Sequence, residues 1–496
     1  MFSFVQPRPR TGLLRAALVG IAAVACQAHA ADSLPDEVGV ALDAAKVPRD
    51  AVVAMVQELG AAEPRLTWQV DKPVNPASIT KLLTTYAGLE LLGRGWTWAT
   101  PVWLQGTVHD GVLDGDLVIK GTGDPKLVME RVWLLLRRVQ QLGAREIRGD
   151  IVLDRSSFVV PDTSPAAFDG EPLRPYNVQA DALMLGFKSV VLTFTPDAAR
   201  GIAVVSADPP LAGVRVDARV PLSSAPCEDW RTELRADFTD PAQMRLSGTY
   251  SSACAERSWA VASPDPNAFN ARALLGLWQE MGGRIGGVVR DGTAPSTPAS
   301  FISTSPSLTE VVRDIDKFSN NVMAQQLFLT LGLVQRGNGS PEASREVLRQ
   351  WAVERFGEAA DGLVIENGSG LSRDTRVSAR LLTRLLLRAW ADPVMPEFVS
   401  ALSVGGVDGT LKDSDVMPGR AHLKTGTLRG VSGMAGYVLA DSGRRCAFVV
   451  IANHENAAAA RPAFDALVRL TAARCGTTRG PGSASAVSAA WRPAGH

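Results

Sequence analysis

The chain has 496 residues, more than a single hydrophobic core usually holds, so we expect at least two domains. Its 51 basic and 51 acidic residues balance, which gives no electrostatic argument for binding nucleic acid or an anionic membrane surface. A hydrophobic content of 46% is ordinary for a globular protein in water.

Residues 1–30 have the features of a secretory signal peptide. Arginines precede an apolar run, and Ala28-His29-Ala30 forms an A-x-A cleavage site. Lipid attachment through Cys26 is the alternative, and it is disfavoured because Ala23 occupies a position where a larger aliphatic residue is usual. No later stretch reaches about 18 uninterrupted apolar residues, so we expect an exported, periplasmic chain with no transmembrane span.

The stretch from 75 to 93, NPASITKLLTTYAGLELLG, has the features of a helix start. Asn75 can cap the helix, Pro76 suits the first helical position, and leucines recur at helical spacing to form an apolar stripe. Because positions i and i+3 share one face of a helix, we expect Ser78 and Lys81 to point the same way.

Residues 99–293 have the pattern of a β-rich insertion. Apolar and polar residues alternate around Asp110-Gly111 and Asp114-Gly115, a pattern typical of hairpins. One helical stretch, MERVWLLLRRVQQLG, interrupts further strand-like pieces, and proline and glycine punctuate the region. We therefore predict inserted β-rich domains here, two of them nested.

The character of the sequence changes to helices from Leu308 onward. Two strand-like segments follow, and a last helix is predicted from about Asn456 to Arg474. We expect residues 31–98 and 294–475 to form one discontinuous domain. Residues 476–496 are rich in glycine, serine and alanine and are predicted to be a disordered tail.

Four cysteines remain after removal of the signal peptide. An even number in an oxidising compartment favours disulfides, and proximity along the chain suggests Cys227 with Cys254 and Cys446 with Cys475. Buried free thiols are the alternative. No C-x-x-C pattern occurs, so a zinc or redox site is not indicated.

A serine and a lysine on one helical face can supply a nucleophile and its base. A serine hydroxyl is a weak nucleophile until a neighbouring base takes its proton. A lysine with its ordinary pKa of about 10.4 is almost fully protonated at pH 7, so the site must lower that pKa by burial or by a nearby cation. Lys424, in the stretch HLKTGTLRG, is the candidate for that cation, and the small Gly426 would let a ligand backbone pair with the strand.

Each of these motifs is weak alone, and the ordinary interpretation of a serine three residues before a lysine is a solvated helix face. Together they are selective. Lys81 is the only lysine with a serine three residues before it, and Lys424 is the only lysine followed by Thr-Gly. Asn321 is the only asparagine with a serine two residues before it, Ser319.

The order Ser78-Ile79-Thr80-Lys81, Ser319-Asn320-Asn321 and Lys424-Thr425-Gly426 resembles the penicillin-recognising serine acyl-transferases. The separation of 241 positions from Ser78 to Ser319 exceeds what a compact β-lactamase allows. That spacing is similar to the low-molecular-mass class C penicillin-binding proteins, the D-alanyl-D-alanine carboxypeptidase/endopeptidase family, in which two domains are inserted after the first motif. Other family-like stretches are GTGDP (121–125), YNVQADALMLGF (176–187), NGSGLSR (367–373) and GGVDGTLK (405–412). One departure is Gly186-Phe187-Lys188, where the family often has Asn-Phe-Asn.

The resemblance implies an α/β fold with a transpeptidase/β-lactamase-like core, an antiparallel sheet flanked by helices, interrupted by the inserted β-rich domains. It implies a serine D-Ala-D-Ala carboxypeptidase that acts on peptidoglycan stem peptides and is inhibited covalently by β-lactam antibiotics. Endopeptidase activity stays open, because both reactions present the same scissile D,D bond. No metal or organic cofactor is implied.

The resemblance also assigns roles to residues of this chain. Ser78 is similar to the acylated nucleophile and Lys81 to its general base. Ser319 would pass a proton to the leaving D-alanine, and Asn321 would hold the amide carbonyl of the substrate.

The third motif would bind the end of the substrate. Lys424 would tune the electrostatic field, and Thr425 and Thr427 would bind the terminal carboxylate on either side of Gly426. The backbone N–H groups of Ser78 and Thr427 would form the oxyanion hole.

Two other classes of protein are disfavoured. A β-lactamase of class A needs a deacylating glutamate, and no glutamate stands four residues before an asparagine. A module that only binds penicillin or wall fragments would tolerate loss of catalytic residues, yet all three motifs are intact. The histidines of the mature chain show no metal-ligand spacing. Asp124 has two open interpretations, a capped turn or a contact to the peptide stem.

Overall fold

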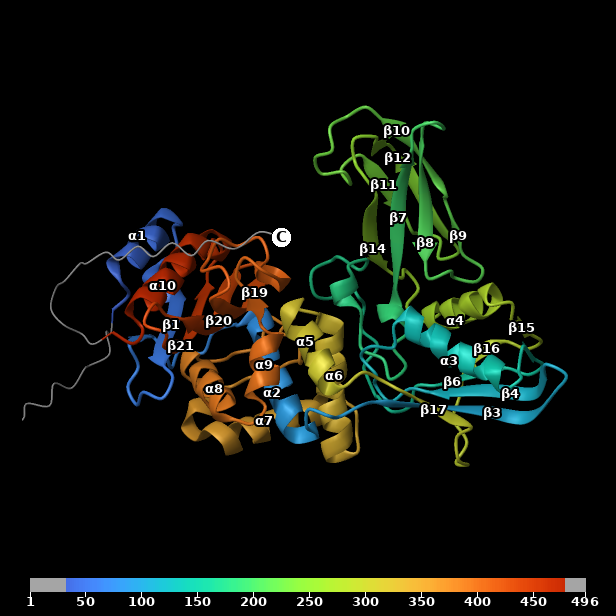
Figure 1. The fold of residues 1–496 in the computed structure, drawn as a ribbon, viewed down its shortest axis with the longest axis horizontal. Helices are drawn as coiled ribbons and strands as arrows, with labels where there is room; N and C mark the ends of the chain where they lie inside the picture. The colour runs from blue at the N-terminus through green and yellow to red at the C-terminus, as the bar shows by residue number, and fades with distance from the viewer. Residues whose placement is uncertain (1–32, 478–496) are drawn as a thin grey trace, which may run out of the picture. The chain divides into compact units, whose positions relative to one another are not determined.

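The computed structural model describes residues 33–477 (Figure 1). The predicted signal peptide and the predicted tail, apart from its first two residues, lie outside the described residues. No helix between residues 33 and 477 is both long enough and apolar enough to cross a membrane.

A six-stranded antiparallel sheet forms the centre of the part that carries the sequence motifs. Its strand order is β18-β19-β20-β21-β1-β2. The bounds are β1 Val52–Glu58, β2 Leu66–Trp68, β18 Ser403–Val404, β19 Ala421–Leu428, β20 Val431–Leu439 and β21 Arg445–Asn453. β1 pairs with β21 in the register Val52↔Ala452, so segments from before and after the insertion share one sheet. The predicted antiparallel sheet is confirmed.

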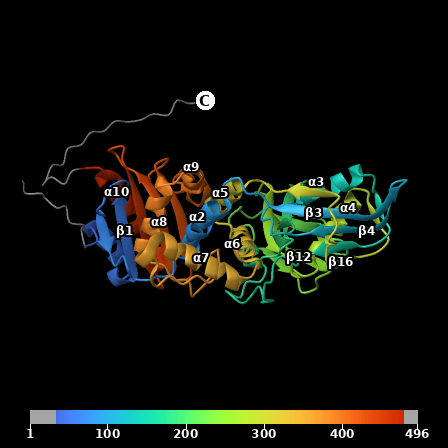
Figure 2. The same cartoon turned by 90° about the horizontal axis from the view of Figure 1, so that it is seen from below.

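Helices cover both faces of this sheet. Along β21, Ala447, Val449 and Ile451 enter one hydrophobic core, whereas Phe448 and Val450 enter the other, as the two-residue period of a strand requires. One core includes α1 (Asp36–Ala44) and α10 (Arg461–Arg474). The other includes α2 (Lys81–Leu92), α5 (Leu308–Lys317), α6 (Asn321–Arg336), α7 (Pro341–Phe356), α8 (Ala379–Ala391) and α9 (Met395–Ala401). Figure 1 shows α10 and α8 on opposite sides of β1, and Figure 2 shows the same helices and strand from below.

The start of the predicted amphipathic helix differs from expectation. Residues Ala77–Thr80 form a 3-10 turn, η2, and α2 begins at Lys81. The Asn75 side chain accepts a hydrogen bond from the Ala77 N–H at 2.9 Å, so it caps the short turn. The predicted apolar stripe is buried, but the amphipathic character is wrong, because every residue from Lys81 to Leu89 is buried and α5, α6 and α7 pack against the helix.

The insertion opens with the hairpin of β3 (Ala99–His109) and β4 (Val112–Lys120). Asp110 and Gly111 have φ of 49° and 86°, the left-handed conformation that a two-residue type I′ turn needs. The hairpin signal at Asp114-Gly115 was misleading. Gly115 lies inside β4 opposite Gly106, where a Cβ on either glycine would lie 2.1–2.2 Å from a backbone oxygen of the opposite strand.

Two further groups of strands follow in the insertion. The first sheet adds β5 (Glu146–Ile147), β6 (Ile151–Asp154), β15 (Arg284–Ile285), β16 (Val289–Asp291) and β17 (Phe301–Thr304), with α3 (Met129–Gln141) and α4 (Phe269–Glu280) packed nearby. Between β6 and β15 the chain forms sheets of five and three strands, in the orders β13-β10-β8-β7-β14 and β11-β12-β9. These strands are β7 (Ser189–Asp197), β8 (Ile202–Asp208), β9 (Arg215–Val216), β10 (Arg219–Ser223), β11 (Leu234–Asp237), β12 (Gln243–Gly248), β13 (Tyr250–Ser251) and β14 (Arg257–Ala262).

β17 pairs with β3, so the first of these sheets extends past the predicted boundary at residue 293. The division into two nested domains between 99 and 293 stays a prediction.

Both predicted disulfides are confirmed. Cys227 is bonded to Cys254 within the insertion, and Cys446 of β21 is bonded to Cys475 at the end of α10. The second bond ties the last helix to the sheet that it covers.

Candidate active site

The amine of Lys81 brings the first two motifs together. Its Nζ lies 3.0 Å from Ser78 Oγ, 2.7 Å from Asn321 Oδ1 and 2.7 Å from the Ser369 carbonyl oxygen. Lys81 is fully buried. A helix turn, the start of α6 and a loop before α8 therefore converge on one nitrogen atom.

These three contacts suit a neutral amine. The oxygens of Asn321 and Ser369 can only accept hydrogen bonds, so they take the two N–H groups of a neutral amine. The lone pair is then left for the third neighbour, the Ser78 hydroxyl, which can donate its proton. The arrangement can thus activate Ser78 as a nucleophile.

The electrostatic surroundings favour the same protonation state. Burial lowers the pKa of Lys81 well below its ordinary value, and the nearby Lys424 lowers this pKa further, against an opposing effect of Asp316. Burial also lowers the pKa of Lys424, to about 8, and Asp316 opposes that shift. The predicted need for burial and a second cation near Lys81 is met by this structure.

Lys424 joins the third motif to the second. Its Nζ donates hydrogen bonds to Ser319 Oγ at 2.9 Å and to the Thr425 carbonyl at 2.8 Å. Ser319 has a φ of 57°, a left-handed conformation that is uncommon outside glycine and clusters at functional sites. Asn321, the first residue of α6, also donates from Nδ2 to the Tyr176 carbonyl at 3.4 Å, so the insertion reaches this site.

Gly426 allows β19 to run close to the turn that carries Ser78. A Cβ at this position would lie 2.5 Å from the Pro76 carbonyl oxygen, so a larger residue would separate strand and turn. Of the two predicted carboxylate ligands, Thr425 shares a hydrogen bond of 2.9 Å with the Thr410 hydroxyl. The Thr427 side chain is exposed and makes no hydrogen bond within residues 33–477.

Sequence reasoning missed the contribution of the loop NGSGLSR. The Asn367 side chain accepts hydrogen bonds from the backbone N–H groups of Ser369 and Gly370, which holds the loop with the Ser369 carbonyl directed at Lys81. Gly370 has a φ of 76°, and a Cβ there would lie 2.0 Å from the Ala77 carbonyl oxygen. Any residue type can provide a backbone carbonyl, so the residue types gave no indication of this contact. Only the resemblance of residues 367–373 to the family's sequence indicated that the loop matters.

Sequence reasoning also missed Asp316, which precedes Ser319 by three residues. Burial raises the pKa of Asp316 to about 6, and Lys424 and Lys81 act against that shift. The available signal was an aspartate within the apolar positions of a predicted helix. Asp124 is also buried, and its Oδ1 accepts from the Lys126 N–H at 2.8 Å, as the capped-turn interpretation expects.

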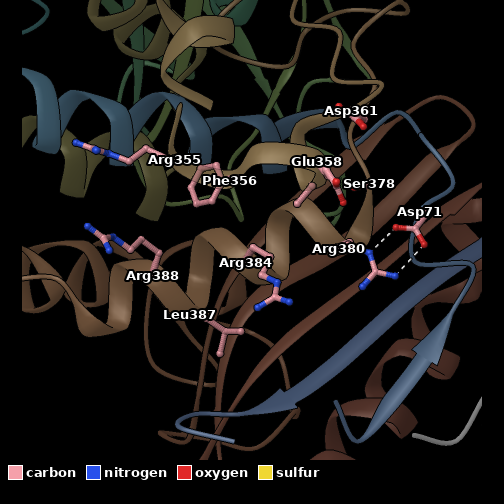
Figure 3. Close-up of a pocket in the computed structure, with 11 residues that line it drawn as sticks. Asp71, Arg355, Phe356, Glu358, Asp361, Ser378, Arg380, Arg384, Leu387 and Arg388 are labelled. Carbon is pink, nitrogen blue, oxygen red and sulfur yellow. Dashed lines mark hydrogen bonds and ion pairs between the residues drawn. The ribbon is translucent and has the colours of Figure 1, made fainter. Parts of the chain in front are cut away.

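A separate hollow lies between the end of α7 and α8 (Figure 3). It has a volume of about 1010 Å³, and four arginines line it: Arg355, Arg380, Arg384 and Arg388. Arg380 is paired with Asp71, and Arg355 with Glu90 at 2.8 Å. Ser378, the serine that lines the hollow, caps α8 by accepting a hydrogen bond from the Leu381 N–H. None of the predicted site residues lines this hollow.

A serine hydroxyl in contact with a buried lysine amine of lowered pKa, held between an antiparallel sheet and a helical layer, defines a serine-type acyl-transferring hydrolase. Comparison with known proteins narrows this class. The chain belongs to the D-Ala-D-Ala carboxypeptidase 3 (S13) family, whose profile matches residues 37–474. The predicted family and serine-peptidase activity are confirmed, and the protein is a D-Ala-D-Ala carboxypeptidase.

The similar proteins cover most of the chain. A D-alanyl-D-alanine carboxypeptidase of Actinomadura sp. (strain R39) is 29% identical over 423 residues, which are 80% of this chain and 76% of the relative. The D-alanyl-D-alanine carboxypeptidase DacB of Haemophilus influenzae is 23% identical over 391 residues, 76% of this chain and 80% of the relative. The crystal structure of penicillin-binding protein 4 from the same species matches with a TM-score of 0.71 and 20% identity, covering 88% of this chain and 99% of that one. This likeness confirms the α/β fold.

Proposed function

We propose that Ser78 carries the acyl group during cleavage of D-Ala-D-Ala-ended stem peptides of peptidoglycan, with Lys81 as its general base. The observation that carries this proposal is the threefold contact of the Lys81 amine. Two acceptors occupy its N–H groups, and the remaining contact is to the Ser78 hydroxyl.

Acylation then proceeds in balanced steps. Ser78 Oγ attacks the carbonyl carbon of the penultimate D-alanine, and its proton passes to Lys81 Nζ. Collapse of the tetrahedral intermediate breaks the peptide C–N bond, and the leaving amine of D-alanine takes a proton. Ser319 Oγ, which lies 2.9 Å from Lys424 Nζ, relays to that amine the proton that Lys81 took from Ser78, so Lys81 is neutral again. Water then attacks the ester and gives a proton to Lys81 Nζ, and this proton returns to Ser78 Oγ as the ester C–O bond breaks and the shortened peptide leaves.

Substrate binding uses the second and third motifs. The Asn321 amide is fixed at one end, since its Oδ1 lies on Lys81, while its Nδ2 makes only a 3.4 Å contact to the Tyr176 carbonyl. An amide carbonyl of the substrate can replace that long contact. The substrate backbone pairs along β19, the hydroxyls of Thr425 and Thr427 bind its terminal carboxylate, and the N–H groups of Ser78 and Thr427 hold the oxyanion.

The proposal extends to three related properties. Cross-linked peptides present the same D,D bond, so the site also supports endopeptidase cleavage. The β-lactam amide resembles that bond, so penicillin acylates Ser78, as a structure of the Haemophilus influenzae protein complexed with a β-lactam suggests for this fold. The exported, periplasmic location follows from the N-terminal sequence and from the cell-wall substrate.

The test uses a labelled penicillin and the intact protein. Peptide mapping should place the adduct on Ser78, and Ser78→Ala should abolish it while Ser400→Ala, an exposed serine of α9, retains it. Monomeric and cross-linked muropeptides followed by product masses then report carboxypeptidase and endopeptidase cleavage separately. An adduct that persists in Ser78→Ala would overturn the assignment, and rapid penicillin turnover without D-alanine release would indicate a β-lactamase.

A further inference from the structure

A charged residue occupies the buried face of α5. Apart from Lys317 at the end of the helix, its other buried positions are apolar: Leu308, Val311, Val312 and Ile315. Asp316 lies next to them with no solvent exposure. Burial of a charge is costly unless an opposite charge compensates it, so the presence of this carboxylate requires an explanation.

Hydrogen bonding within the described residues does not explain Asp316. Both of its carboxylate oxygens are buried and have no hydrogen-bond partner within residues 33–477. The Thr85 hydroxyl is close enough to lower the pKa of Asp316, but its single proton is donated to the Lys81 carbonyl at 2.8 Å, so it cannot compensate the carboxylate charge. The next residue, Lys317, pairs with Asp408.

The compensating charges come from the active site. Asp316 interacts electrostatically with Lys81 of α2 and with Lys424 of β19, and both lysines are fully buried. Within residues 33–477, the other elements packed against α5 place no charged group beside Asp316. The start of α6 presents the uncharged Asn321, and Glu397 of α9 pairs with Arg94.

Charge balance in this enclosed group selects one protonation pattern. Two ammonium groups and one carboxylate would leave a net positive charge buried. One ammonium group and one carboxylate, with the second amine neutral, leave no net charge buried. Lys81 is the amine assigned as neutral: its three contacts accommodate a neutral amine, and burial together with Lys424 lowers its pKa well below the ordinary value, whereas the pKa of Lys424 is about 8. Lys424 is the ammonium, and it donates to Ser319 Oγ and to the Thr425 carbonyl.

We propose that Asp316 is a positioning residue for acylation, whose carboxylate keeps Lys424 an ammonium in the pH range in which Lys81 is the neutral base. This inference rests on the function proposed above and adds a residue to it. Although burial raises the pKa of Asp316 to about 6, the carboxyl group is still ionised at pH 7. No hydrogen bond joins Asp316 to Ser78 within residues 33–477, so Asp316 acts through its electrostatic interaction with the two lysines.

The substitution Asp316→Asn removes the charge and keeps the size of the side chain. Loss of a nearby negative charge lowers the pKa of a lysine, so both Lys81 and Lys424 should lose their protons at lower pH. In the pH profile of acylation, the rising limb reports deprotonation of Lys81 and the falling limb deprotonation of Lys424. Both limbs should move to lower pH, by about one unit or more.

The experiment measures the second-order rate of penicillin acylation against pH for the full chain, Asp316→Asn and a matched control. Asp314→Asn is the control, because Asp314 lies on the same helix but pairs with Lys126 at 2.7 Å and is partly exposed. The control should keep both limbs in place. A uniform loss of rate in Asp316→Asn with unmoved limbs would show a merely structural role and would overturn the proposal.

A second variant, Asp316→Glu, tests the proposal if Asp316→Asn does not fold. Asp316→Glu keeps the charge, so its limbs should stay at their original pH even where the extra methylene slows the reaction. Movement of the limbs in folded Asp316→Glu would contradict charge balance. Failure of the proposed function has a different signature, because the unchanged protein would then form no adduct on Ser78 at any pH.

Discussion

Replacement of Lys81 by arginine tests the base most directly. Arginine keeps a positive charge at this position but has no accessible neutral form, since its pKa lies above about 12. The Lys81 side chain is fully buried, and Ser78, Asn321 and Ser369 surround its amine within 3.0 Å. A guanidinium group there can donate to all three neighbours but can accept no proton from Ser78.

The size of the effect follows from the protonation states. An amine with the ordinary pKa of about 10.4 is neutral in only about four molecules in ten thousand at pH 7, whereas burial beside Lys424 makes the neutral form far more populated. Loss of a positioned general base slows a reaction by about 10² to 10⁴. We therefore expect Lys81→Arg to raise the activation free energy of acylation by about 3 to 5 kcal/mol.

The assay is the rate of adduct formation with a labelled penicillin, measured with thermal unfolding of the same preparations. Lys72→Arg is the control, because Lys72 is an exposed lysine whose amine donates to the Asp50 carbonyl. The control should acylate like the unchanged protein. A folded Lys81→Arg protein that acylates within about threefold of the unchanged rate would refute the assignment of Lys81 as the base.

Three further substitutions probe the surroundings and the fold. Gly370→Ala should slow acylation by at least tenfold, because its Cβ would lie 2.0 Å from the Ala77 carbonyl oxygen, beside Ser78. Gly60→Ala is the control, because Gly60 also has a left-handed backbone but has open space around it. Equal acylation rates in the two variants would contradict this prediction. Replacing Cys227 and Cys254 by serine should destabilise the insertion by about 3 kcal/mol in denaturant unfolding, and an unchanged midpoint would argue against the bond. Burial alone would raise the pKa of Asp154, but its hydrogen bonds hold it at about 2, so this carboxylate stabilises the fold above about pH 4. Asp154→Asn should therefore lower the free energy of unfolding by about 2 kcal/mol at pH 7, and its difference from the unchanged protein should narrow as the pH falls toward about 2. A difference in unfolding free energy that does not change with pH would refute this linkage.

The local chemistry of the sequence was enough to predict several features. The turn at Asp110-Gly111 was predictable because two left-handed residues suit Asp-Gly in a short hairpin. The disulfides were predictable from an even number of cysteines and short separations. The three motifs were predictable because their residue types and order are selective in combination.

Local patterns failed where packing decided the outcome. α2 was expected to have one exposed face, but three helices surround it and bury all of its first nine residues. The hairpin signal at Asp114-Gly115 was misleading because the glycines there serve close approach of two strands and not a turn.

Only the tertiary structure shows why Lys81 can act as a base. Its amine meets Asn321 and Ser369 across separations of 240 and 288 residues, and one of those contacts is a backbone carbonyl that any residue type could provide. The balancing charge of Asp316 likewise depends on three buried groups from α2, α5 and β19. Residue types and their order along the chain predict which groups can react, whereas burial and contacts between distant segments determine their protonation, because a pKa depends on the surroundings of a group in space.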